Sequence, residues 1–314
     1  MHDPSHRTSA APIVLAGGTG ALGGRIAREL VRQGASVTAL VRRGTERSRV
    51  AALEEAGARI AEVDFDDVSG LALACGGAAC VVSALSGLRD AVVDAQSRLL
   101  DAAVRAGVPR FIPSDFAADF MKLPPGRNRN FDLRREFHAR LDAAPIRATS
   151  ILNGAFAEML VGPAPIVLFP LRRVLYWEDP EQPLDFTTMD DVAEYTASAA
   201  LDASTPRVLR IAGDVVTARD LAAMMTALSG KRYRLLRGGD LGRLERLVHL
   251  ARAVRPQPGE LYPIWQGLQY LHAMYSGEAK LTPLDNDRYP HTPWTTTRTV
   301  LGAKLRAPRK TAPA

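Results

Sequence analysis

The chain has 314 residues, a length typical of one large or two small domains, and 46% of its residues are hydrophobic and 24% charged. Forty Lys and Arg residues against 34 Asp and Glu give a formal net charge of +6, and the basic residues are spread along the whole chain. These values exclude disordered and fibrous proteins, and the lack of a basic cluster argues against nucleic-acid binding.

The cysteines and the chain ends set further limits. Cys75 and Cys80 are the only cysteines and have no metal-ligand spacing, so we expect no metal site and no disulfide framework. Residues 1–11 are polar and lack the apolar segment of a signal peptide, which predicts a flexible tail. Prolines and polar residues interrupt the apolar stretch 151–171, so we expect no membrane span and a cytoplasmic protein.

Residues 12–113 alternate short β-branched runs with amphipathic stretches. The periodicity predicts strands at 12–16, 36–41, 59–63, 79–84 and 110–113, and helices at 21–33, 45–56, 67–74 and 88–106. Strands that alternate with helices in this way form a parallel sheet with helices on both faces. The fold class expected is α/β, with a doubly wound parallel Rossmann sheet.

The pattern changes after residue 113. A long irregular loop over 114–130 precedes a helix at 131–143 and a strand at 146–152, and shorter elements follow beyond residue 160. We therefore predict a dinucleotide-binding Rossmann domain over 12–155 and a smaller C-terminal α/β lobe that covers the substrate over 156–306. Residues 307–314 are expected to form a second flexible tail.

A glycine-rich segment, GGTGALGG at 17–24, joins the first strand to the first helix. Gly17 allows a tight turn, Gly20 lets the backbone approach a pyrophosphate, and Gly23 permits close packing of helix and strand. The free N–H groups at the start of the helix and its dipole then meet the phosphate charge. The predicted contacts are Gly17, Gly18, Thr19, Gly20, Ala21, Leu22 and Gly23.

The end of the second strand indicates which dinucleotide binds. An NAD site usually has Asp or Glu here, whereas this strand ends with Arg42 and Arg43, and the first acidic residue is Glu46. A guanidinium can bind the 2′-phosphate of NADP through two hydrogen bonds. The pattern favours NADP(H), although two solvated arginines in an arginine-rich chain are the alternative.

Two further strand ends are candidates for cofactor contacts. Asp64 and Phe65 follow the third strand and can contact the adenine, and Ser83, Ala84 and Leu85 follow the fourth, beside the adenosine and pyrophosphate. Ordinary turn chemistry at a strand end is the alternative for both segments.

The chain lacks the catalytic Tyr-x-x-x-Lys pair of ordinary short-chain dehydrogenases, because none of its seven tyrosines has a lysine four residues later. It resembles instead the NmrA-like, isoflavone-reductase-like branch of the atypical short-chain dehydrogenases. The resemblance rests on GGTGALGG at 17–24, LVR at 40–42, VDF at 63–65 and RFIPSDF at 110–116, and continues from Phe131 to Phe156. It extends more loosely to FTTMDDVAEY at 186–195.

The resemblance implies either of two functions. Some members of this family are NADPH-dependent reductases of small phenolic, aromatic or enone-like molecules, and others are non-catalytic sensors of the nucleotide redox state that act on partner proteins. The reductases carry a general acid/base lysine on the helix after the PS(E/D)F loop, and Arg134 occupies that position here. An arginine stays protonated, so Arg134 can stabilise an oxyanion but relays protons poorly.

Three other residues are candidates for proton transfer. His138 lies four residues after Arg134 and hence on the same helical face, and its side chain ordinarily titrates near neutral pH. Lys122, in the long loop, can fold over the substrate, while Asp115 is better suited to bracing that loop. A histidine at a helix edge is also frequently structural, which leaves His138 with two interpretations.

The sequence therefore predicts NADPH-dependent reduction of a small aromatic, quinone or enone-like molecule, with Arg134 and His138 as the catalytic residues. The alternative is an NADP(H)-sensing regulatory protein with a protein partner and no turnover. The expected partner of a reductase is a small-molecule substrate. We expect neither function to involve nucleic acid or a membrane.

Overall fold

The computed structural model describes residues 11–162, 164–290 and 293–306. The chain forms two compact units, and it passes between them several times. Among the described residues, the first unit contains 11–116, 133–151 and 192–209, and the second contains 117–132, 152–162, 164–191, 210–290 and 293–306. The sequence-based boundary after residue 155 is close to one of these crossings. The predicted tails, apart from Ala11, lie outside the described residues.

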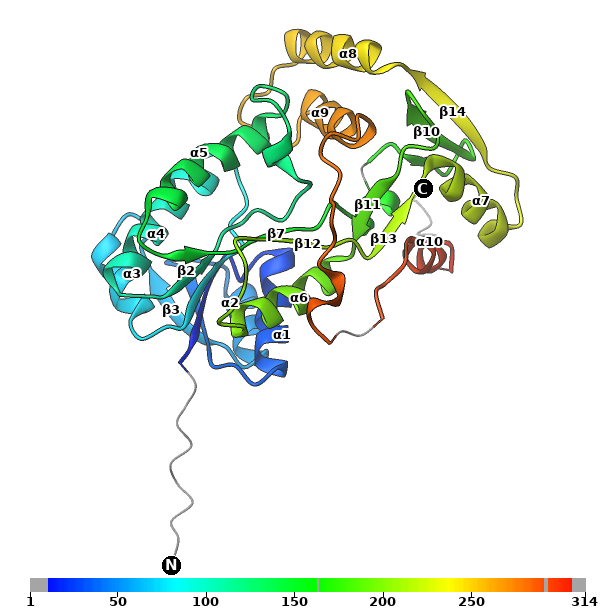
Figure 1. Cartoon of the computed structure of the whole chain (residues 1–314). Helices are drawn as coiled ribbons and strands as arrows, with labels where there is room; N and C mark the ends of the chain where they lie inside the picture. Colours follow the sequence, from blue (N-terminus) through cyan, green and yellow to red (C-terminus); the bar gives the residue numbers. More distant parts are fainter. Residues whose placement is uncertain (1–10, 163, 291–292, 307–314) are drawn as a thin grey trace, which may run out of the picture. The chain divides into compact units, whose positions relative to one another are not determined.

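A six-stranded parallel sheet forms the centre of the first unit (Figure 1). Its strands follow the spatial order β3-β2-β1-β4-β5-β6, in which the direction of winding reverses between β1 and β4. This order confirms the predicted Rossmann fold. The strands are β1 (Ile13–Ala16), β2 (Val37–Arg42), β3 (Arg59–Val63), β4 (Cys80–Ser83), β5 (Arg110–Ile112) and β6 (Arg147–Ala148).

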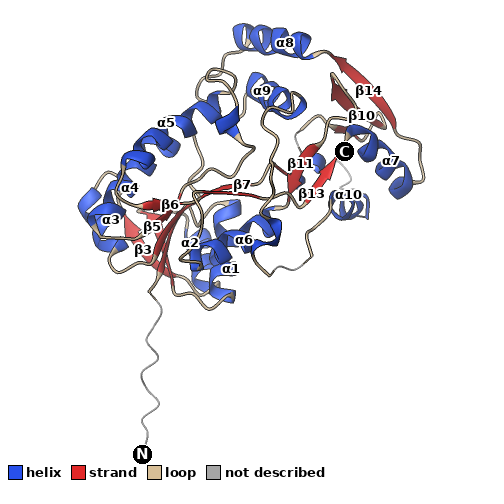
Figure 2. Ribbon diagram, in the orientation of Figure 1, coloured by secondary structure: helices blue, strands red, loops and turns tan. Residues whose placement is uncertain are grey.

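Helices cover both faces of this sheet, with α1, α2 and α6 on one face and α3, α4 and α5 on the other (Figure 2). Parallel strands are buried on both faces, and accordingly every residue of β1 and β4 is buried. The helices are α1 (Ala21–Arg32), α2 (Arg47–Glu55), α3 (Val68–Cys75), α4 (Gln96–Arg105), α5 (Arg129–Ala143) and α6 (Met189–Leu201).

Three elements of the first half differ in detail from the sequence-based prediction. The helix expected at 88–106 begins with a π-helical turn, Asp90–Ala95, before α4. The long loop contains one short 3-10 turn, Phe120–Lys122. The strand expected at 146–152 is divided into β6, which ends the large sheet, and β7 (Ser150–Leu152), which pairs with β12 (Val208–Arg210).

The second unit has a core of its own, in which Trp177, Phe186 and Tyr275 are buried. It contains two small three-stranded sheets in the orders β14-β10-β9 and β13-β11-β8. Its strands are β8 (Ala155–Phe156), β9 (Val167–Leu168), β10 (Arg173–Trp177), β11 (Leu184–Thr187), β13 (Asp214–Val216) and β14 (Arg234–Gly239). Its helices are the 3-10 helix η3 (Ala157–Val161), α7 (Ala218–Ser229), α8 (Leu241–Val254), α9 (Ile264–Tyr275), the 3-10 turn Asn286–Arg288, and α10 (Thr297–Arg306).

Candidate functional site

The loop after β1 makes a turn that depends on glycine. Gly17 has φ +79°, and a Cβ at this position would lie 2.5 Å from the carbonyl oxygen of Ala84. The N–H of Gly20 donates to the Gly17 carbonyl at 3.0 Å and closes the turn. The backbone can therefore follow this path only because residue 17 has no side chain.

Helix α1 begins directly after this turn, with Gly20 as its N-cap. Within the described residues, no side-chain cap accepts from the start of the helix, and no acidic residue lies in its first turn. A Cβ at Gly23 would lie 2.1 Å from the Gly17 carbonyl oxygen, so the helix packs directly on the loop backbone. Exposed N–H groups on a tight glycine turn form a cradle that fits a pyrophosphate.

The end of β4 lies beside this loop. Ala16 of β1 pairs with Ser83 of β4, and the Ala84 N–H donates to the Ala16 carbonyl at 2.9 Å. Leu85 continues along the same edge, where its carbonyl accepts a 2.7 Å hydrogen bond from Ser114 Oγ. The strand order thus brings the predicted segments 17–23 and 83–85 together at the point where the sheet reverses its winding, the usual ligand position in this fold.

The end of β2 presents two unpaired cations. Arg42 and Arg43 are both exposed, and neither guanidinium forms an ion pair within the described residues. The Arg42 carbonyl accepts from the Thr45 N–H at 3.1 Å and from Thr45 Oγ1 at 2.6 Å, which shapes the turn after the strand. Both side chains are available to an anionic ligand such as a phosphate.

Asp64 and Phe65 follow β3, the neighbour of β2. Arg42 pairs with Val63 across the two strands, so the Asp64 segment begins next to the arginines. The Asp64 carboxylate is exposed and accepts from the Asp66 N–H at 2.9 Å, whereas Phe65 is buried. The exposed carboxylate can contact a ligand, but Phe65 packs in the core of the first unit.

On α5, the two predicted catalytic residues have different surroundings. Arg134 is half-buried, whereas His138 is 7% exposed and lies against the fully buried Asp115, with 2.6 Å between His138 Nε2 and Asp115 Oδ2. Asp115 therefore braces α5 against the loop after β5. This contact agrees with the bracing role predicted for Asp115. The sequence did not indicate that His138 is its partner.

Arg207 lies beside the imidazole of His138 and also contacts Ser150. Arg207 Nη2 lies 3.4 Å from His138 Nδ1, and Arg207 Nη1 donates to Ser150 Oγ at 2.6 Å. An ionised carboxylate only accepts, so His138 Nε2 donates its proton to Asp115 Oδ2. No sequence pattern marks Arg207 as a partner of His138, because the two residues are 69 positions apart along the chain.

The pKa of Asp115 is lowered in this cluster. Burial by itself would raise that pKa, but the charge and the hydrogen bond of His138, a hydrogen bond from Ser150 and the charge of Arg134 together lower it. Asp115 is therefore an ionised carboxylate that interacts electrostatically with the Arg134 guanidinium. This arrangement suits charge stabilisation better than proton abstraction.

Lys122 belongs to the second unit. Its ammonium donates to the Lys280 carbonyl at 2.7 Å and lies 3.6 Å from the Asp119 carboxylate, while the Lys280 ammonium pairs with Asp185. Both lysines are thus engaged in contacts that hold this unit together.

Two kinds of site are absent from the described part of the chain. No group of three or more His, Cys, Asp or Glu side chains is arranged to hold a metal ion. No helix among these residues is both long enough and apolar enough to cross a membrane.

Sequence comparison relates the chain to known proteins. The model of the NmrA-like family matches residues 9–240. Pinoresinol reductase 1 of Arabidopsis thaliana is 33% identical over 248 residues, which cover 72% of this chain and 77% of that protein. The isoflavone reductase homolog IRL of Zea mays is 29% identical over 244 residues, covering 71% and 75%.

Solved structures share the fold over nearly the whole chain. The structure of AtPrR2 with NADP⁺ and (+)-pinoresinol has a TM-score of 0.78 at 23% identity and covers 94% of this chain and 98% of the other. The NADPH complex of the Escherichia coli quinone oxidoreductase QOR2 has a TM-score of 0.76 at 20% identity, covering 94% and 100%.

Proposed function

The chain belongs to the NmrA-like family, and from this premise we propose that it is an NADPH-dependent reductase of a small aromatic, quinone or enone-like molecule. The observation that carries the proposal is the glycine cradle beside the end of β4, at the reversal point of a Rossmann sheet. Relatives and fold neighbours that reduce pinoresinol, isoflavones and quinones support the substrate class.

The residues fit NADP(H). The cradle at 17–23 would hold the pyrophosphate, and the exposed Arg42 and Arg43 would hold the 2′-phosphate, because a carboxylate that would repel it is missing from the end of β2. Asp64 and the segment 83–85 would border the adenosine and the pyrophosphate. When bound, the cofactor supplies the hydride that reduces a carbonyl or conjugated carbon.

Arg134 would stabilise charge on the substrate, and His138 would hold α5 in position. Arg134 would stabilise the negative charge that develops on the substrate oxygen, because its guanidinium remains protonated at all relevant pH values. His138 holds Asp115 through its Nε2 proton, so we assign it the positioning of α5 and assign final protonation of the substrate to water. The positioning role replaces the direct proton delivery expected from the sequence.

A second function has one observation in its favour. The family lysine is replaced by Arg134, and a non-catalytic NADP(H) sensor needs no proton relay. A sensor would bind NADPH and NADP⁺ with clearly different affinities and pass that difference to a protein partner.

NADPH oxidation with pinoresinol, an isoflavone and 1,4-naphthoquinone, followed by absorbance, distinguishes the two functions. We expect turnover of at least one compound, lost in Gly20→Trp, which obstructs the cradle, and retained in Ala203→Trp, at an exposed turn of the same unit. Binding of NADPH without turnover of any compound, together with unequal NADPH and NADP⁺ affinities, would establish the sensor instead. On an identified substrate, the pH–rate profile of His138→Asn should keep its shape near neutral pH. If the neutral-pH limb disappears in this variant, His138 is the residue that delivers the proton to the substrate.

A further inference from the structure

The positive charge of the chain is concentrated in one segment of the second unit. Basic residues occur throughout the sequence, but residues 231–255 contain eight Lys and Arg residues and two acidic residues. Their formal net charge of +6 equals that of the whole chain, so the remaining residues are formally neutral. This basic segment contains β14 and α8, which follow one another along the chain (Figure 1).

The fold does not neutralise the cations of the basic segment. The two acidic residues are already engaged, because Asp240 accepts from the Arg243 N–H at 2.6 Å and Glu245 pairs with Arg127 at 2.6 Å. Glu178, outside the segment, accepts from the first N–H of α8 at 3.0 Å. Eight cationic side chains are exposed and form no ion pair within the described residues: Lys231, Arg232, Arg234, Arg237, Arg243, Arg246, Arg252 and Arg255.

Helix α8 has an exposed face that is both basic and apolar. Leu244 is buried in the core of the unit, and α8 packs on α9. Away from this buried side, Leu250 is 59% exposed and Val254 is 76% exposed. Arg243 and Arg246 precede Leu250 by seven and four residues, so the three side chains share one face of the helix. Aliphatic groups that lie among unpaired arginines are therefore in contact with water.

This combination of side chains indicates which kind of anion fits the face. A nucleic acid offers phosphates to the arginines, but its bases stack on aromatic side chains rather than on aliphatic ones. A second copy of the same face would bring like charges together. The surface of an anionic membrane offers phosphates for the guanidinium groups and acyl chains for the aliphatic groups.

We propose that α8 and β14 bind the surface of a membrane that contains anionic lipids. Arg243 and Arg246 would contact the lipid phosphates. Leu250 and Val254 would enter the boundary between headgroups and acyl chains. The sequence-based expectation of no membrane contact rests on the lack of a spanning segment, and binding at the surface requires none. The proposal does not depend on the reductase function, because it involves no cofactor and no redox step.

Co-sedimentation of the full chain with lipid vesicles in about 100 mM salt tests the charge requirement. We expect binding to vesicles of equal parts phosphatidylcholine and phosphatidylglycerol to be at least about tenfold tighter than to phosphatidylcholine alone. The double variant Arg243→Gln/Arg246→Gln should weaken binding to the anionic vesicles by at least about tenfold, because each cation near such a surface contributes about fivefold. The control Arg28→Gln/Arg140→Gln removes the same charge from exposed positions of the first unit and should change the affinity by less than about twofold.

The double variant Leu250→Ser/Val254→Ser tests the apolar requirement. Both side chains are exposed, so the melting temperature should remain unchanged. Binding to the anionic vesicles should weaken by at least about tenfold, because the variant loses two side chains that the membrane would bury. The control Leu73→Ser removes an 85% exposed side chain from the first unit and should bind like the unaltered chain.

Five outcomes would each overturn the proposal. Three concern charge: equal binding to the two kinds of vesicle, no binding to anionic vesicles at millimolar lipid, or an equal loss of binding in the two paired arginine variants. The fourth is unchanged vesicle binding by Leu250→Ser/Val254→Ser. The fifth is tighter binding of a DNA duplex than of the anionic vesicles, which would identify a nucleic acid as the partner instead.

Discussion

The glycine turn at 17–23 and the face of α5 that carries Arg134 and His138 lie in the same unit, yet they depend on different features of the chain. The glycine turn is built from backbone: Gly17 and Gly23 act through the side chains they lack, and the N–H groups at the start of α1 are its polar groups. The α5 face is built from side chains, and the role of His138 depends on Asp115 and Arg207. A backbone site can therefore be recognised locally, whereas a side-chain site depends on its distant partners.

The largest expected effect tests Arg134 on the α5 face. If its guanidinium stabilises developing charge, Arg134→Ala should lower kcat by about 10²–10³-fold with NADPH affinity almost unchanged. Arg134→Lys should retain part of the activity, because the charge remains while the planar fork is lost. Steady-state kinetics and NADPH titration measure both. Arg140→Ala, at an exposed position of α5, is the control, and normal turnover by Arg134→Ala would remove the assignment.

Gly23→Ala tests the backbone packing of α1 on the glycine turn. The new Cβ would lie 2.1 Å from the Gly17 carbonyl oxygen, so the loop or α1 must shift. We expect NADPH affinity to fall by about 100-fold, or about 2.7 kcal/mol, within the usual cost of overpacking. Gly24→Ala is the matched control, because its Cβ would lie 3.3 Å from the Gly18 carbonyl oxygen. Similar NADPH affinities of the two variants would contradict the cradle.

Arg42→Ala tests the side-chain contribution of one of the two arginines proposed to hold the 2′-phosphate. A charge-assisted contact with the 2′-phosphate contributes about 1.5–3 kcal/mol, so the preference for NADPH over NADH should fall by about 10-fold or more. NADH affinity should remain nearly constant. Fluorescence titration with both cofactors measures this change, with Arg28→Ala, an exposed arginine of α1, as the control. Equal affinities of the unaltered protein for NADPH and NADH would be incompatible with this role.

The smallest effect concerns the pH dependence of stability at the Asp115–His138 pair. The pKa of Asp115 is lowered in the folded chain, so its ionised form stabilises the fold above the unfolded pKa near 3.9. That contribution is lost as the pH falls through the folded pKa, at about 1.4 kcal/mol for each unit of difference. Below about pH 4, the melting temperature of Asp115→Asn should therefore fall less steeply than that of the unaltered chain.

Asp142→Asn is the control for this experiment, because Asp142 is an exposed carboxylate near the end of the same helix that also pairs with Arg207. Its melting temperature should follow the unaltered chain in acid. If Asp115→Asn and the unaltered chain lose stability in parallel, Asp115 does not carry the stabilising charge.

The sequence by itself determined the parallel sheet and the glycine turn that joins β1 to α1. Strand and helix periodicities are local, and β1, the glycine turn and α1 are consecutive, so their chemistry can be read from 20 contiguous residues, 13–32. Arg42 and Arg43 follow the same logic, since a strand end in this fold has a known place beside the next strand.

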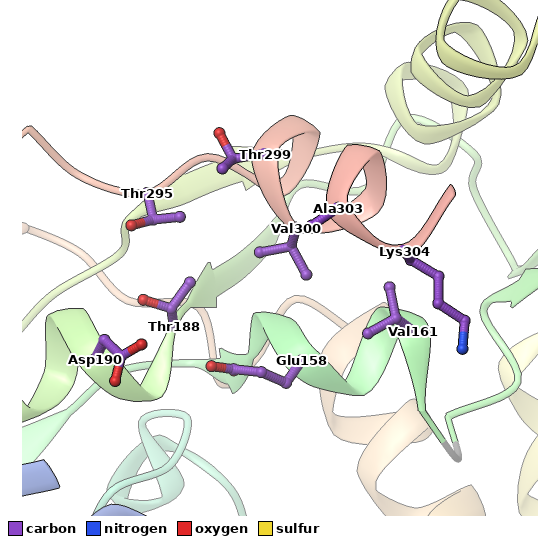
Figure 3. Close-up of a pocket in the computed structure, with 9 residues that line it drawn as sticks. All are labelled: Glu158, Val161, Thr188, Asp190, Thr295, Thr299, Val300, Ala303 and Lys304. Carbon is purple, nitrogen blue, oxygen red and sulfur yellow. The ribbon is translucent and has the colours of Figure 1, made fainter. Parts of the chain in front are cut away.

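Only the tertiary structure decided which side chains act together. The pairing of Asp115 with His138 spans 23 residues, and that of Arg207 with His138 spans 69. A cavity beside Glu158 arises because η3 and the start of α6 meet α10, which lies more than a hundred residues further along the chain (Figure 3). Such contacts depend on how helices pack, and packing is set by the shape of the whole core rather than by any local pattern of residues.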